Sequence, residues 1–123
     1  MKQKSFTDIE QSKKLAEILP PESADTLYCV DFDGDVLFIA PKQYSGSFRH
    51  QPELIIPCWS LAALLDVLPN KLQIALVIND FQGDRKEKYG IGSVEHDKYD
   101  CYAGNPIDAC YEMILKLHEL NLL

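Results

Sequence analysis

The chain has 123 residues, of which 46% are hydrophobic, and it carries a net charge of −7 at pH 7. The length suits a single domain over residues 1–123, and the composition excludes intrinsic disorder, which needs low hydrophobicity together with high net charge. Nineteen acidic residues against twelve basic ones repel a phosphate backbone, so no nucleic-acid partner is expected. The acids are spread along the chain, which indicates a solvated acidic exterior rather than a nucleic-acid mimic.

The sequence favours a cytoplasmic protein. Its start lacks the apolar segment of a secretory signal, and no apolar stretch approaches the roughly 20 residues that cross a bilayer, so no membrane contact is expected. The four cysteines form no C-x-x-C pair and are expected to be free thiols: Cys29, Cys58, Cys101 and Cys110. A zinc site built from the last two with His96 and His118 would match no ligand spacing, so we expect no metal and no cofactor.

The first predicted element is a helix that begins at Thr7 and ends at Pro20. The Thr7 hydroxyl would cap the first turn, with Glu10 as its capping-box partner. Its spacing predicts a buried stripe of Ile9, Ala16 and Leu19, with Leu15 and Ile18 at the edges.

A β-hairpin is predicted next. Runs rich in β-forming residues, 27–32 and 36–40, flank Asp33-Gly34, a dipeptide that supplies the positive φ of a tight turn. A loop of about 17 residues, 41–57, follows and is longer than ordinary connections, which favours a functional or irregular segment.

The second helix is predicted over about 58–68. Its apolar residues have i, i+3, i+4, i+7 spacing, and they are Leu61, Leu64, Leu65 and Leu68. A strand over 72–78 and an antiparallel partner within 88–102 come next. The third helix has the clearest signals, with Asn105 as cap and Pro106 in the first turn. Its buried positions are predicted to be Ile107, Cys110, Ile114 and Leu117.

A shift of 49 residues reveals internal similarity. It aligns 15–20 with 64–69, and Asp31-Phe32-Asp33-Gly34-Asp35 with Asp80-Phe81-Gln82-Gly83-Asp84. A duplicated plan and a chance pairing of common stop and turn signals are both open explanations. The predicted fold class is α+β, with three helices and an about four-stranded, mainly antiparallel sheet in the order αββαββα.

The segment 29–35 resembles the opening motif of the haloacid-dehalogenase superfamily, in which a strand ends in Asp-x-Asp-Gly-Thr. The resemblance implies a magnesium-dependent phosphatase or hydrolase with Asp31 as nucleophile and Asp33 as general acid and base. Here Asp35 stands in place of the threonine, and a second strand follows at once. We therefore favour a hairpin turn, which accounts for the same residues without chemistry.

Other functional motifs are not supported by the sequence. A calcium loop beginning at Asp31 would need glycine and glutamate where the chain has Val36 and Lys42. A Cys–His nucleophile pair has no local signature here, and nucleophile-elbow, P-loop and dinucleotide motifs are absent from the sequence.

The long loop is the preferred candidate for partner binding, because aromatic residues and arginine are enriched at protein interfaces. The candidate residues are Tyr44, Phe48, Arg49, His50 and Trp59. The alternative is that Phe48 and Trp59 pack at the edge of the core and hold the loop down.

Three segments, 6–20, 57–65 and 105–123, resemble a group of short uncharacterised proteins of gut anaerobic bacteria, some of them encoded on phage-like or mobile elements. The resemblance covers the three helices and implies no assigned activity. We expect a non-enzymatic binding or regulatory module whose protein partner contacts the loop before the second helix. The alternatives are the phosphatase above and a structural subunit of a larger assembly.

Overall fold

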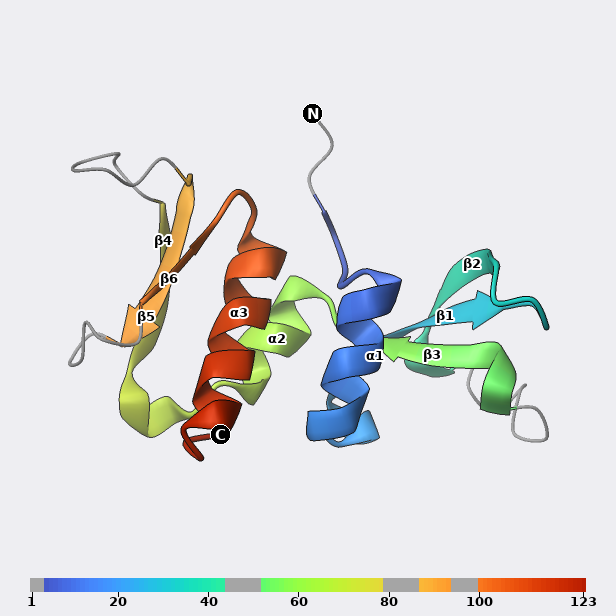
Figure 1. The fold of residues 1–123 in the computed structure, drawn as a ribbon, viewed down its shortest axis with the longest axis horizontal. Coiled ribbons are helices and arrows are strands. Elements are labelled where there is room, and N and C mark those ends of the chain that lie inside the picture. Colours follow the sequence, from blue (N-terminus) through green and yellow to red (C-terminus); the bar gives the residue numbers. More distant parts are fainter. Residues whose placement is uncertain (1–3, 44–51, 79–86, 94–99) are drawn as a thin grey trace. The chain divides into compact units, whose positions relative to one another are not determined.

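The computed structural model describes residues 4–43, 52–78, 87–93 and 100–123 (Figure 1). The fold is α+β, as predicted, and the described residues form three α-helices and two antiparallel three-stranded sheets. The chain divides into two compact units, residues 6–63 and residues 64–123 together with 1–5. A single domain over residues 1–123 stays a prediction. In the described ranges, no helix is long and apolar enough to span a membrane.

The cap of helix α1 (Ile9–Ile18) lies one residue later than predicted. Asp8 is its cap, and the capping box is completed by Gln11, whose side chain accepts the Asp8 N–H at 3.1 Å. Thr7 does not cap the helix. Its side chain is fully buried, and its hydroxyl accepts the Trp59 N–H instead. Within α1, Leu15 is buried and Ala16 is exposed, which reverses the predicted positions of these two residues.

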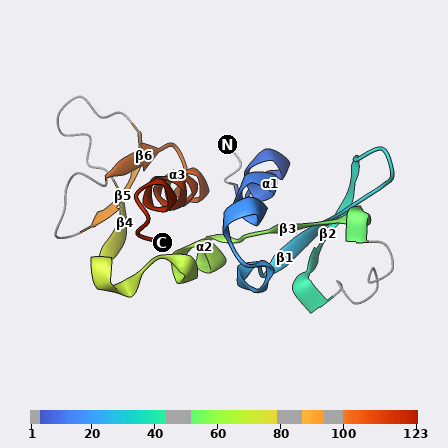
Figure 2. The same cartoon turned by 60° about the horizontal axis from the view of Figure 1, so that its bottom comes forward.

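The first sheet consists of β1 (Thr26–Val30), β2 (Val36–Pro41) and β3 (Ile55–Cys58), with β1 in the centre. Helix α1 packs against one face, where Ile9 and Phe6 contact the cluster of Tyr28, Val30 and Cys58 (Figures 1 and 2). The opposite face carries a second cluster, formed by Leu27, Cys29, Ala40 and Ile55. Strand β3 takes the last three residues of the predicted loop and the first residue of the predicted second helix. It was not predicted, because four residues that include a proline give a weak strand signal. Two short 3₁₀ helices flank this region, Pro21–Ser23 and Pro52–Leu54.

The β1–β2 hairpin is confirmed. The two strands pair antiparallel, and Gly34 has a φ of +88°, which favours glycine. The Gly34 N–H donates to the Asp31 carbonyl at 3.0 Å, and the Asp31 N–H donates to the Asp35 carbonyl at 2.9 Å. The register shifts between Cys29 and Val30, which skips Leu37 and leaves a β-bulge in β2.

Helix α2 (Leu61–Val67) is shorter than predicted, because Cys58 still belongs to β3. The Ser60 hydroxyl accepts the Ala63 N–H at 3.2 Å and caps its first turn. Of the four leucines predicted to be buried, Leu64 and Leu68 are buried, Leu61 is half-buried and Leu65 is exposed.

The second sheet consists of β4 (Ile74–Ile78), β5 (Tyr89–Ser93) and β6 (Cys101–Ala103), with β5 in the centre. The expected antiparallel partner of β4 is therefore confirmed. The 3₁₀ turn Asn70–Leu72 precedes β4. The single four-stranded sheet is not confirmed. The short strands β3 and β6 were not predicted, and in the described residues each completes a separate three-stranded sheet.

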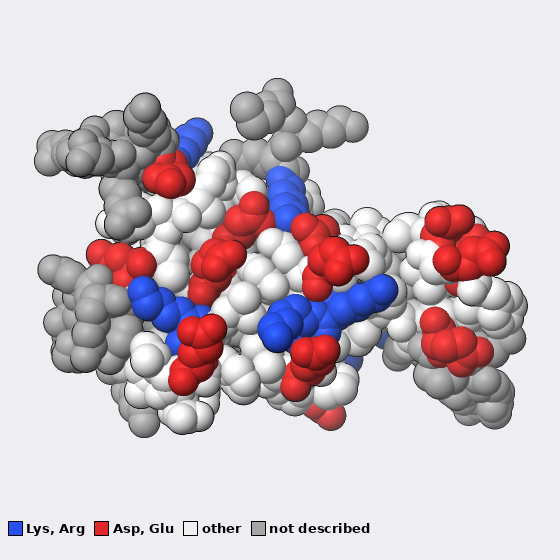
Figure 3. Space-filling model, in the orientation of Figure 1, with Lys and Arg blue, Asp and Glu red and all other residues white. Residues whose placement is uncertain are grey.

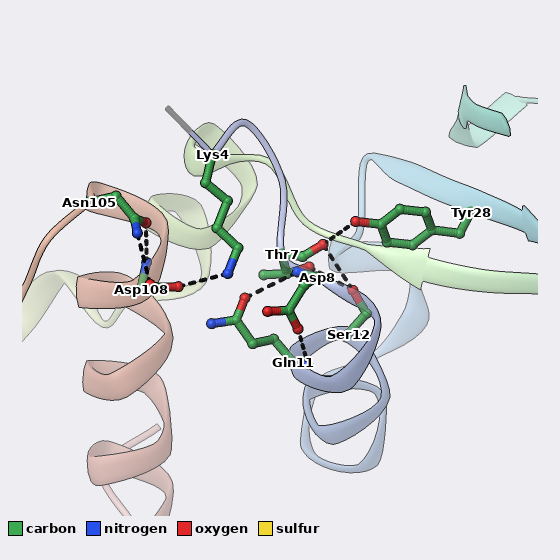
Figure 4. Close-up of polar contacts among 8 residues, drawn as sticks. All are labelled: Lys4, Thr7, Asp8, Gln11, Ser12, Tyr28, Asn105 and Asp108. Carbon is green, nitrogen blue, oxygen red and sulfur yellow. Dashed lines mark hydrogen bonds and ion pairs between the residues drawn. The ribbon is translucent and has the colours of Figure 1, made fainter. Parts of the chain in front are cut away.

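Helix α3 (Pro106–Glu119) matches the prediction closely. Asn105 is its cap and accepts the Asp108 N–H at 2.9 Å, and the four predicted core positions are buried. The helix contacts β5 and β6. Within this unit Lys4 also reaches Asp108, with 2.9 Å between Nζ and Oδ1 (Figure 4).

The internal duplication is not confirmed. A shift of 49 places the turn Pro21–Ser23 on Asn70–Leu72, and β1 within one residue of β4. The strand order differs, however, since β1 is central in its sheet whereas β4 pairs only with β5 in the second sheet. The matching segment 80–84 lies outside the described residues.

Candidate functional site

Asp31 closes the hairpin turn with its side chain. Its Oδ1 accepts the Asp33 N–H at 2.9 Å and the Asp35 N–H at 3.0 Å, which holds the backbone between the strands. The Asp33 side chain is exposed at the tip of the turn. The geometry of this turn therefore explains why the segment has the Asp-x-Asp-Gly residues that resemble the dehalogenase motif.

A buried polar cluster ties the start of α1 to the first sheet (Figure 4). The hydroxyls of Thr7 and Ser12 lie 2.8 Å apart, and the Tyr28 hydroxyl donates to the Thr7 carbonyl at 2.6 Å. The Thr7 hydroxyl also accepts the Trp59 N–H at 3.1 Å. Every buried side-chain polar atom in the described residues has a partner, so this cluster stabilises the unit rather than offering free groups to a ligand.

Trp59 belongs to the interior. It is fully buried, and its Nε1 donates to the Ser23 hydroxyl at 2.9 Å. This agrees with the interpretation of Trp59 as a core residue. The other four candidate contact residues, Tyr44, Phe48, Arg49 and His50, lie outside the described residues, so their role stays a prediction.

Asp25 joins the strands to the start of α2. Its carboxylate accepts the Ser60 N–H at 3.0 Å and the Ser60 hydroxyl, and it also accepts the Thr26 hydroxyl at 3.1 Å. Burial acts to raise the pKa of Asp25, but the hydrogen bonds from Ser60 and Thr26 outweigh it, and the pKa lies below its ordinary value.

None of the four cysteines forms a disulfide, and their surroundings make them poor nucleophiles. Burial raises the pKa of Cys58 to about 12, with a contribution from the negative charge of Asp25, and burial raises the pKa of Cys110 to about 12. Desolvation also raises the pKa values of Cys29 and Cys101. Because the thiolate is the reactive form, these environments give no support to cysteine catalysis.

A further feature of the surface is the distribution of its metal-ligating and charged side chains. Within the described ranges, no three histidine, cysteine or acidic side chains gather in a way that could hold a metal ion; His96, one of the four side chains weighed for zinc, lies outside them. Figure 3 shows acidic side chains spread over the face in view, with basic ones between them. Neither the metal-ligating side chains nor the charged side chains of the described residues therefore indicate a binding site.

The most unusual surface in the described part of the chain is the outer edge of β2. Four consecutive apolar residues are 44–63% exposed, and they are Val36, Leu37, Phe38 and Ile39. Phe32, in the preceding turn, is 78% exposed. Since β1 is the one strand that pairs with β2 among the described residues, the other side of β2 is a sheet edge there. We call these four residues the β2 edge.

An open cavity of about 290 Å³ lies on the side of the sheet away from α1. Its lining is mostly apolar and includes Leu27, Ile55 and Pro57, and Lys42 is its basic residue. The Lys42 Nζ donates to the Glu22 carbonyl at 2.9 Å. Lys42, Ile55 and Pro57 all belong to the loop predicted over 41–57, so the cavity is lined in part by that segment.

Sequence reasoning missed the β2 edge. Residues 36–40 were read as one strand of a hairpin, and a short apolar run does not by itself tell which side of a strand is covered. A usable signal was present, because this run lacks the alternation of a half-buried strand and ends at Pro41, a residue that sheets tolerate mainly at edges.

Comparisons with protein-family models, with curated proteins and with solved structures found no match to this chain.

Proposed function

We propose that the chain is a non-enzymatic, protein-binding module, and that the partner contacts the β2 edge and the loop predicted over 41–57 that follows it. The observation that carries the proposal is the exposure of four consecutive apolar side chains on a strand that has a free side in the described structure. Exposed apolar edge strands promote unwanted pairing, and proteins usually shorten, charge or cover them. An apolar edge of this kind is suited to receiving a strand from a partner.

The energetic argument follows from area. Fully burying a leucine, isoleucine, valine or phenylalanine side chain contributes about 1.5–3 kcal/mol, and the four β2 edge residues are close to half exposed. Covering them would contribute about 1 kcal/mol each, before the cost of association. Main-chain hydrogen bonds to an added strand would supply the geometry, and the side chains would supply the specificity.

The test compares three forms of the full chain in affinity capture from native lysate. Leu37→Thr with Phe38→Thr keeps β-forming residues but removes apolar area. Val77→Thr, at a 54% exposed position on the edge strand β4 of the other sheet, is the matched control. We expect the same specific protein to be retained by the wild type and the control and lost by the double variant.

A fourth form separates the two parts of the surface. Scrambling residues 44–50 leaves the β2 edge unchanged. If binding is lost in that form alone, the partner contacts the loop and not the β2 edge. Equal retention of the partner by all four forms would overturn the proposal.

A further inference from the structure

We propose that the strand received by the β2 edge is the β2 edge of a second copy of this chain, in antiparallel pairing. The inference rests on the proposed function and names its partner. What distinguishes this occupant from any other strand is the distribution of charge along β2.

The two ends of β2 carry opposite charges. Asp33 and Asp35 precede the strand and Lys42 follows it, and all three side chains are exposed. The Lys42 ammonium has one described acceptor, the Glu22 carbonyl, and no carboxylate partner in the described part of the chain. It therefore retains N–H groups that can meet an acid from another molecule.

Antiparallel pairing about a twofold axis brings unlike ends together. A pairing centred on the β2 edge sets Val36 of one copy across from Ile39 of the other. It then brings Lys42, just past the end of β2 in each copy, to the end of the strand where Asp35 and the turn residue Asp33 of the other copy lie, and the contact occurs twice. Such an interface is self-complementary, as a twofold dimer requires. Parallel pairing would instead bring aspartates to aspartates and lysine to lysine.

The net charge of the chain makes the opposite charges at the two ends of β2 important for association. Two copies that each carry a charge of −7 repel one another, so stable contact needs an apolar or charge-complementary surface. The β2 edge offers both, with exposed apolar residues in the middle and opposite charges at the ends. Cross-strand apolar pairs and opposite-charge pairs both stabilise neighbouring strands.

Two features shape the expected contact. Pro41 has no N–H, so the last position of β2 contributes only a carbonyl to an added strand. The bulge at Leu37 interrupts the ladder with β1 and bends the strand locally. In a twofold pairing centred on the β2 edge the bulges of the two copies lie near each other, so both strands bend at the same place.

The test is charge reversal followed by sedimentation velocity over a range of protein concentrations. Lys42→Glu and Asp33→Lys each create two like-charge contacts and should weaken dimerisation about tenfold. The combination Asp33→Lys with Lys42→Glu recreates both attractive contacts with exchanged signs, and its dimer dissociation constant should return to within about threefold of the wild type. Val77→Thr should leave the dimer unchanged, and Leu37→Thr with Phe38→Thr should abolish it.

Each variant is checked by circular dichroism and thermal unfolding. If a charge reversal does not fold, Lys42→Gln and Asp33→Asn replace it, and each should weaken the dimer by a smaller factor. A second measurement is hydrogen exchange, in which those amides of 36–39 that point away from β1 should become more protected as protein concentration rises.

The outcomes are distinct. A wild type that stays monomeric at every concentration overturns the dimer, as does a dimer that is lost with Val77→Thr but survives the β2 substitutions. A double reversal that fails to restore association overturns the antiparallel polarity. The proposed function and this inference can also be told apart. If the wild type is monomeric but binds a different protein, and the variant Leu37→Thr with Phe38→Thr no longer binds that protein, the proposed function is supported and the dimer is overturned.

Discussion

The Tyr28 hydroxyl in the central strand of the first sheet donates a 2.6 Å hydrogen bond to the carbonyl oxygen of Thr7, just ahead of α1. The same threonine accepts the Trp59 N–H through its hydroxyl and donates its own N–H to the Trp59 carbonyl at 3.0 Å. Three segments that are distant in sequence therefore meet at one residue.

Replacing Thr7 by valine should destabilise the protein strongly. The substitution keeps the shape but leaves the Trp59 N–H without its buried acceptor, and it leaves the Ser12 hydroxyl with only the Thr7 carbonyl at 3.4 Å, at a cost of about 2–3 kcal/mol. Tyr28→Phe removes one hydrogen bond and should cost about 1 kcal/mol. Urea unfolding gives both values, with exposed Lys13→Ala as a control expected to change the free energy of unfolding by less than about 0.5 kcal/mol. Equal stability of Thr7→Val and the control would contradict this account.

The contribution of Asp25 to stability should depend on pH. Its pKa in the folded protein lies below the ordinary value of 3.8, so the folded state favours the carboxylate. The stabilisation is therefore present above pH 3.8 and is lost as the pH falls through the lower folded value. Urea unfolding of the wild type and Asp25→Asn should show a difference that is constant near neutral pH and shrinks in acid. A difference that grows as the pH falls would show that the carboxylate is destabilising.

The cysteines should differ in reactivity toward a thiol reagent at pH 8. Cys101 is half-buried, whereas Cys58 and Cys110 are fully buried with pKa values of about 12. We expect Cys101 to react first and these two to react on the order of a hundredfold more slowly, after local or global unfolding. Mass spectrometry of the labelled peptides identifies each site, and Cys101→Ser should remove the fast phase. Fast labelling of Cys110 in the native protein would contradict the burial described here.

Asp31 separates the turn from the phosphatase alternative. Asp31→Ala removes the acceptor of two backbone N–H groups and should destabilise the hairpin by about 1 kcal/mol, whereas Asp31→Asn keeps an oxygen acceptor and should cost less than half of that. Asp33→Asn at the exposed tip is the control. A phosphatase screen with magnesium completes the experiment. Turnover by the wild type that is lost in Asp31→Asn would show that Asp31 has a catalytic role and would contradict a purely structural role in the turn.

Elements whose signals lie within a few residues were predictable. The hairpin at Gly34, the Asn105 cap and Pro106 start of α3, and the buried stripe of α3 follow from turn chemistry, capping and periodicity. Thr7 shows the limit of such local reasoning. A threonine and an aspartate stand side by side at the start of α1, and both residue types can cap. Thr7 was chosen as the cap, but tertiary hydrogen bonds use its hydroxyl and leave Asp8 to cap the helix.

The sequence by itself determined the α+β class, the three helices, the β1–β2 hairpin and the turn role of the Asp31 segment, because each depends on backbone preferences of neighbouring residues. Tertiary structure alone decided that β3 and β6 complete two separate sheets and that Trp59 is interior. It also decided that the apolar residues of β2 are exposed, because Pro41 and the lack of alternation indicate an edge strand but not what covers it. Those features depend on which strand pairs with which, and pairing joins residues that are far apart along the chain. Exposure of a side chain is a property of its neighbours in space, which a local pattern does not specify.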